Sequence, residues 1–155
     1  MNIYKHDIVF QEVPNHISLA FYVCGCPLKC PGCHSPELWT EKTGTPLTPI
    51  MFLELVRRYR QRISCVLFLG GEWRQDELLE FLKLAHQEDL LTALYTGLDH
   101  IPHELQQHLD FLKTGPWITA RGGLWSPTTN QIFRDLRSGE TLNHLFQHNT
   151  KEPSL

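Results

Sequence analysis

The cysteines of this chain are distributed very unevenly. Of five cysteines, four lie within residues 24–33, whereas Cys65 stands alone in an apolar run and is predicted to be a small core residue. An odd number of cysteines in a chain that we expect to be cytosolic argues against a disulfide framework, and close clustering is typical of metal binding or catalysis. The fold must therefore bring several thiols to one place.

Cys26, Cys30 and Cys33 have a spacing that suits an inorganic cluster. They read Cys26-Pro-Leu-Lys-Cys30-Pro-Gly-Cys33. Thiolates are the preferred ligands of iron–sulfur centres, and three thiolates so close in sequence can converge on one cluster. A four-iron cluster held by three cysteines keeps one iron open, as a catalytic metal centre requires. We therefore interpret Cys26, Cys30 and Cys33 as ligands of a [4Fe–4S] cluster.

Structural zinc is the main alternative for these cysteines. Cys24 or His34 could supply a fourth ligand, but zinc sites usually combine a C-x₂-C pair with a second, distant pair. The sequence has no second pair, which disfavours zinc. Cys24 ends a predicted strand and is interpreted as structural.

Length and composition bound the remaining possibilities. With 155 residues, of which 41% are hydrophobic, the chain suits one compact domain over residues 1–149, followed by a flexible tail over 150–155. A net charge of -3 gives no footprint for nucleic acid. No apolar run is long enough to cross a bilayer and no signal peptide is recognised, so we expect no membrane association and a cytoplasmic location.

Strand-like and helix-like segments alternate along the chain. Strands are predicted at residues 17–24, 63–69 and 90–95, from residue 111 and at 131–136. Residues 117–120 either continue the strand that begins at 111 or form a fifth strand. Helices are predicted after Thr48-Pro49, at 74–88 and at 102–108. Such alternation predicts an α/β fold with a parallel sheet and right-handed crossovers.

The unusual motifs all follow predicted strands. Ligands of parallel sheets bind beyond the carboxyl ends of the strands, so one rim should gather the cysteine segment, Gly70-Gly71-Glu72, Thr96-Gly97 and Lys113. Paired glycines allow close backbone approach, and an ionised glutamate accepts hydrogen bonds from an ammonium group. Thr96 and Gly97 could offer a hydroxyl and an open backbone, and Lys113 could meet a carboxylate; ordinary turns and a solvated lysine are the alternatives.

Together, C-x₃-C-x₂-C after the first predicted strand and Gly-Gly-Glu after the second resemble the radical S-adenosylmethionine superfamily. The resemblance implies an incomplete parallel (βα) barrel, which we expect to have about five or six strands. It also implies that S-adenosylmethionine chelates the open iron, and that reductive cleavage yields methionine and a 5′-deoxyadenosyl radical.

Further segments narrow the resemblance. Cys30 to Trp39, Tyr95-Thr96-Gly97 and Thr128 to Gln131 are similar to activating proteins of the anaerobic ribonucleoside-triphosphate reductase, and the similarity extends over about residues 7–135. It implies that the radical takes a hydrogen atom from a glycine of that reductase. A flavodoxin or ferredoxin would supply the electron.

Three positions depart from the pattern of the family. Gly32 stands where many superfamily members have an aromatic residue, His34 where reductase activases often have tyrosine, and Trp73 where they often have proline. By this correspondence we place His34 with the cofactor-binding residues. The competing hypotheses are a radical enzyme for a small molecule, an activase of another glycyl-radical enzyme, and a structural zinc or iron–sulfur module.

Overall fold

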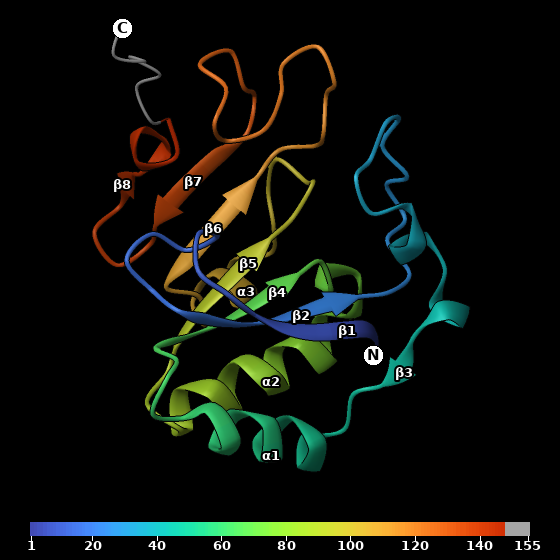
Figure 1. Cartoon of the computed structure of the whole chain (residues 1–155), viewed down its shortest axis with the longest axis vertical. Coiled ribbons are helices and arrows are strands. Elements are labelled where there is room, and N and C mark those ends of the chain that lie inside the picture. The colour runs from blue at the N-terminus through green and yellow to red at the C-terminus, as the bar shows by residue number, and fades with distance from the viewer. Residues whose placement is uncertain (148–155) are drawn as a thin grey trace, which may run out of the picture.

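A single mixed sheet organises the chain. A computed structural model describes residues 1–147 and contains eight strands in the order β3-β1-β2-β4-β5-β6-β7-β8 (Figure 1). The strands are β1 (Asn2–Val9), β2 (Ser18–Val23), β3 (Thr45–Pro46), β4 (Cys65–Leu69), β5 (Leu91–Tyr95), β6 (Phe111–Thr114), β7 (Ile132–Asp135) and β8 (Glu140–Thr141).

The centre of this sheet is parallel and its margins are antiparallel. Strands β2, β4, β5 and β6 run in parallel, with Leu19 beside Val66 and Val66 beside Thr92. Antiparallel pairing adds β1 and β3 on one side and β7 and β8 on the other. The parallel unit agrees with the predicted alternation. The incomplete barrel expected from the resemblance stays a prediction.

Helices α1 (Pro49–Tyr59) and α2 (Gln75–Gln87) cover one face of the sheet (Figure 1). As predicted, Thr48 caps α1, because its hydroxyl accepts a hydrogen bond from the Met51 amide at 3.2 Å. Phenylalanines from the strands and helices stack between the two layers, with Phe21 and Phe68 5.4 Å apart. A short helix, α3 (His103–Gln106), precedes β6.

The opposite face of the sheet carries no long helix in residues 1–147. Its core joins Leu67, Ala93 and Phe133 to Val13 of the β1–β2 connection. Within the described residues there are also four short 3-10 helices: η1 (Pro36–Trp39), η2 (Glu41–Thr43), η3 (Glu72–Arg74) and η4 (Asn143–Leu145). No helix of the described chain is long and apolar enough to span a membrane.

The carboxyl ends of the four parallel strands share one edge of the sheet. The cysteine segment leaves β2 there, η3 follows β4, Thr96 follows β5, and a long loop, residues 115–131, follows β6 (Figure 1). Parallel pairing of Tyr22 with Leu69 and of Leu69 with Tyr95 aligns these ends. The predicted rim is thus present.

Two local predictions differ from the structure. Residues 117–120 form no strand, because Ile118 and Thr119 are exposed and the segment belongs to the loop after β6. Strand β1 was not predicted from the sequence, and β3 and β8 extend the sheet beyond the expected five or six strands. The tail predicted at 150–155 lies outside the described residues.

Candidate iron–sulfur and cofactor site

Backbone hydrogen bonds fold the cysteine segment into a compact loop. The amides of Gly25 and Cys26 both donate to the Leu38 carbonyl, at 2.8 and 2.9 Å, and the Cys33 amide donates to the Cys30 carbonyl at 3.1 Å. The Ser35 amide also donates to the Cys33 sulfur at 3.4 Å. The loop therefore returns on itself and keeps its three cysteines half-buried.

Cys24 is separate from these three thiols. It is 1% exposed, and its sulfur lies 3.6 Å from the Thr43 hydroxyl. A Cβ atom on Gly44 would come within 2.7 Å of the same sulfur, so the backbone packs tightly against it. This packing agrees with the structural role predicted for Cys24.

A cavity of about 140 Å³ brings several predicted site residues together. Its lining includes Cys26, Cys33, Gly70, Glu72 and Gly97. Burial raises the pKa of the Cys26 thiol, and the backbone amides of Leu28 and Lys29 partly offset that rise. Because metal ligands must be deprotonated, cluster loading will depend on pH.

Glu72 is held by one oxygen and leaves the other without a partner. The Thr96 hydroxyl donates to Glu72 Oε1 at 2.6 Å, and Thr96 in turn accepts a hydrogen bond from the Leu98 amide at 3.0 Å. Glu72 Oε2 is buried and makes no hydrogen bond within residues 1–147. Burial raises the pKa of this carboxyl, whereas the Thr96 hydrogen bond and the Lys113 charge lower it. Thr96 thus orients Glu72.

Lys113 is buried at the end of β6. Its ammonium group donates to the carbonyls of Gly115 and Thr96, at 2.8 and 3.3 Å. Burial lowers the pKa of Lys113 to about 8, against the raising effect of Cys30 and Glu72. An ammonium has three donors, so one remains for a ligand.

The glycines of the site make room for specific neighbours. Gly70 and Gly71 have φ values of 83° and 109°, which other residues rarely adopt. A Cβ atom on Gly97 would lie 2.5 Å from Leu28 Cδ1. Leu28 belongs to the cysteine segment, so Gly97 allows that segment to pack against the end of β5.

Contacts from the loop after β6 were not predicted in detail. The rings of His34 and Trp117 lie 4.2 Å apart, and a Cβ atom on Gly32 would come within 2.7 Å of the Thr119 hydroxyl. His34 is therefore packed by an aromatic ring from the loop that follows β6 at the same edge of the sheet.

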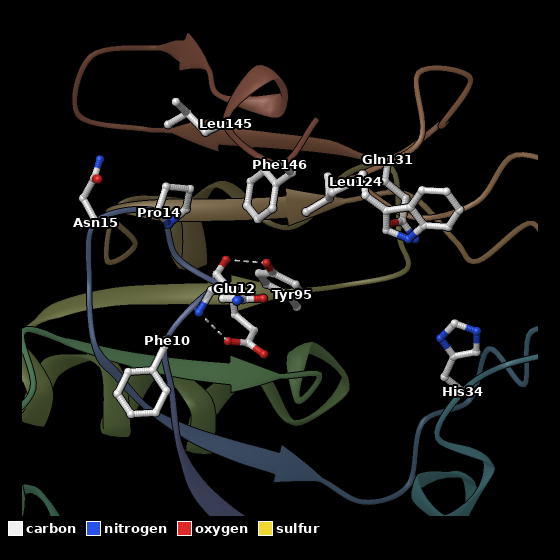
Figure 2. A pocket seen from close by; sticks show the side chains of 12 residues that line it. Phe10, Glu12, Pro14, Asn15, His34, Tyr95, Leu124, Gln131, Leu145 and Phe146 are labelled. Carbon is white, nitrogen blue, oxygen red and sulfur yellow. Dashed lines mark hydrogen bonds between the residues drawn. The ribbon is translucent and has the colours of Figure 1, made fainter. Parts of the chain in front are cut away.

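A larger cavity, the sheet groove, begins at His34. It has a volume of about 850 Å³ and runs along the face of the sheet opposite the helices. Figure 2 shows His34 at one end, Asn15 at the other and Tyr95 on the floor. The Tyr95 hydroxyl donates to the Glu12 carbonyl and fixes the β1–β2 connection over the sheet. Phe10, on that connection, is 66% exposed.

The donor set fits an iron–sulfur cluster and an amino-acid ligand. Three half-buried thiols on one loop offer soft ligands, Glu72 Oε2 offers a free acceptor, and Lys113 offers a donor. Among the described residues, no three His, Cys, Asp or Glu side chains are close enough to hold a single metal ion.

Comparison with known proteins identifies the family. Residues 16–121 match the family described as "4Fe-4S single cluster domain". The chain belongs to this family. It is also 32% identical over 79 residues to the pyruvate formate-lyase-activating enzyme of Clostridium pasteurianum, over 47% of this chain and 33% of that protein. The chain thus spans about a third of that relative. Together the two matches support membership of the radical S-adenosylmethionine superfamily.

Proposed function

We propose that this member of the 4Fe-4S single cluster domain family is a radical S-adenosylmethionine activase that forms the glycyl radical of anaerobic ribonucleoside-triphosphate reductase. The observation that carries the proposal is the free, buried Oε2 of Glu72 in the same cavity as Cys26 and Cys33. An unpartnered carboxylate oxygen beside an iron–sulfur site suits the ammonium group of a cofactor.

Each residue has a distinct role in this proposal. Cys26, Cys30 and Cys33 hold the cluster, Glu72 accepts from the cofactor's ammonium group, and Lys113 donates to its carboxylate. A cluster held by these thiolates would, once reduced, supply the electron for cleavage of S-adenosylmethionine to methionine and a 5′-deoxyadenosyl radical. Thr96 keeps Glu72 in position through its 2.6 Å hydrogen bond.

The sheet groove suits a segment of a protein substrate. It starts beside the cysteine segment at His34, and its lining includes the exposed aromatic side chains of Phe10 and Trp125. Exposed aromatic residues are enriched where proteins bind one another. An extended chain carrying a glycine would therefore have an open route to the site.

The choice of the reductase rests on the resemblance of residues 30–39, 95–97 and 128–131. The named relative, by contrast, activates pyruvate formate-lyase. An activase of a different glycyl-radical enzyme is therefore the second candidate. A flavodoxin or ferredoxin would supply the electron in either case.

The decisive experiment uses anaerobically reconstituted, dithionite-reduced protein. It is mixed with S-adenosylmethionine and assayed for 5′-deoxyadenosine, with and without anaerobic ribonucleotide reductase. Electron paramagnetic resonance reports a glycyl radical on the reductase. A Cys30→Ala variant, which loses one proposed ligand, is the negative control for cluster assembly.

The possible results separate the candidates. We expect cleavage together with a glycyl signal on the reductase. Cleavage with a radical only on pyruvate formate-lyase would reassign the partner. Zinc without iron and sulfide would show a structural metal module. Conversion of a small molecule with no protein partner would show a different radical enzyme.

A further inference from the structure

Three tryptophans near the cysteine segment have buried indole nitrogens without a hydrogen-bond partner. Within residues 1–147 these are Trp39, Trp73 and Trp117. An indole nitrogen can only donate, and a buried donor left unsatisfied costs about 1–3 kcal/mol. Buried polar atoms in folded proteins are nearly always paired, so an acceptor from outside the polypeptide is expected.

Two of the three indoles line the cysteine cavity. Trp39 ends η1, which follows the cysteines, and Trp73 lies in η3, directly after Glu72. Both line the cavity of about 140 Å³ that also exposes Cys26 and Cys33. Trp117 is not among the residues of that lining and packs on His34 instead.

The backbone at Gly70 is adapted to the Trp73 ring. A Cβ atom on Gly70 would lie 2.6 Å from Trp73 Cη2, so only glycine leaves room for the indole there. Glu72 lines the same cavity and its Oε2 is also unpartnered, so neither indole nitrogen is bonded to that oxygen. The two donors therefore require a different acceptor.

We infer that Trp39 and Trp73 donate N–H···S hydrogen bonds to the sulfur atoms of the cluster held by Cys26, Cys30 and Cys33, and thereby raise its reduction potential. The inference rests on the proposed function. Cluster sulfides and cysteine thiolates carry negative charge and accept hydrogen bonds. Such bonds stabilise the more negative, reduced cluster more than the oxidised one, and they are among the known determinants of cluster potential.

The test compares Trp73→Phe, Trp39→Phe and the double variant with the parent protein. The substitution keeps a six-membered aromatic ring and removes the five-membered ring of the indole, together with its N–H donor. Each protein is reconstituted anaerobically, and the reduced cluster is followed by electron paramagnetic resonance during a redox titration. We expect the reduced-to-oxidised ratio at a fixed solution potential to fall about threefold to tenfold per indole, where tenfold equals about 59 mV for one electron.

Trp125→Phe is the matched control. Trp125 is 66% exposed and is not part of the cavity lining, so its variant should keep the parent potential. Iron and sulfide content, measured for every variant, confirms equal cluster loading. Electron–nuclear double resonance on protein with an isotope-labelled indole nitrogen gives a second readout, in which a coupling to the reduced cluster disappears in Trp73→Phe.

The outcomes distinguish this inference from the function on which it rests. Fully loaded Trp39 and Trp73 variants with the parent potential and no indole coupling would overturn the inference and leave the proposed function intact. A parent protein that assembles no iron–sulfur cluster would remove both. Lower potentials in the two cavity variants, with no change in Trp125→Phe, would establish the hydrogen bonds.

Discussion

The two oxygens of the Glu72 carboxylate are in different situations. One accepts from Thr96 at 2.6 Å, and the other is buried without a partner in the described chain. An amide at this position would keep the size and the Thr96 contact but lose the negative charge. The free oxygen is thus the part of the residue that we assign to the cofactor.

We predict that Glu72→Gln retains the cluster and binds S-adenosylmethionine more weakly, by about tenfold to a hundredfold, because a hydrogen bond to a charged group contributes about 1.5–3 kcal/mol. Iron analysis and equilibrium binding measure the two properties separately. Unchanged cofactor affinity would exclude Glu72 from the site. Loss of the cluster would instead show that the carboxylate supports the cysteine segment.

Lys113 allows a prediction about pH. Its pKa is lowered from 10.5 to about 8, chiefly by burial. Between these values the folded protein binds fewer protons than the unfolded chain, so this residue makes the folded state more stable as the pH rises through that window. Lys113→Met removes the dependence.

The measurement is urea unfolding of metal-free protein at several pH values from 7 to about 10. The free energy of unfolding of the parent should rise relative to that of Lys113→Met, by on the order of 2 kcal/mol across the window. The comparison cancels the titration of groups on which Lys113 has no electrostatic influence. A constant difference between the two proteins would show that Lys113 is not desolvated.

At the scale of elements, the turn from β4 to α2 combines two constraints. Gly70 has a φ of 83°, and the Trp73 ring fills the space that a side chain would need. Gly139, between β7 and β8, has a φ of 76°, but a Cβ atom added there would meet nothing within 4 Å. An alanine at Gly139 would therefore introduce backbone strain alone, whereas an alanine at Gly70 would introduce backbone strain and a steric clash with Trp73.

We predict that Gly70→Ala destabilises the protein by about 2–4 kcal/mol, whereas Gly139→Ala costs only about 1–2 kcal/mol of left-handed backbone strain. Denaturant unfolding of the metal-free variants measures both values. In a Trp73→Leu background the cost of Gly70→Ala should approach that of Gly139→Ala. Equal costs in the parent background would mean that the indole moves aside freely.

Elements with a regular apolar pattern were predictable from the sequence, and those without one were not. The buried runs of β2, β4 and β5 and the capped helix α1 have strong local signals, and all four are present. Strand β1 has four consecutive exposed residues, Tyr4 to Asp7, and so lacks the alternation of a half-buried strand. Its position follows from antiparallel pairing with β2, which is a tertiary interaction.

In the site, too, some features were predictable from the sequence and others were not. Parallel strands place their carboxyl ends together, so the sequence was sufficient to predict that Glu72, Thr96 and Lys113 would be neighbours. The packing of Leu28 over Gly97 and of Trp117 on His34 depends on how two loops meet. Neither contact leaves a periodic signal in the sequence.

At the scale of the molecule, the two faces of the sheet are covered differently. Helices α1 and α2 bury one face, while the sheet groove occupies the other and opens beside the cysteine segment (Figures 1 and 2). Radical chemistry and partner binding would therefore share the end of the groove at His34. Substitutions elsewhere along the groove should separate binding from cofactor cleavage.

Substitutions of Phe10 and Ile50 can separate partner binding from cofactor cleavage. Phe10 lines the groove and is 66% exposed, whereas Ile50 is 71% exposed on α1, on the opposite side of the sheet. We predict that Phe10→Ser lowers the yield of glycyl radical per 5′-deoxyadenosine by about tenfold, which equals about 1.4 kcal/mol of binding, the size of effect expected if Phe10 is one of the few residues that carry the binding energy. Ile50→Ser should match the parent. Spin quantification on the reductase, with 5′-deoxyadenosine measured in the same samples, gives the ratio. If both variants kept the parent ratio, the reductase would have to bind elsewhere, and the groove would lose its assignment as the route by which a glycine reaches the radical.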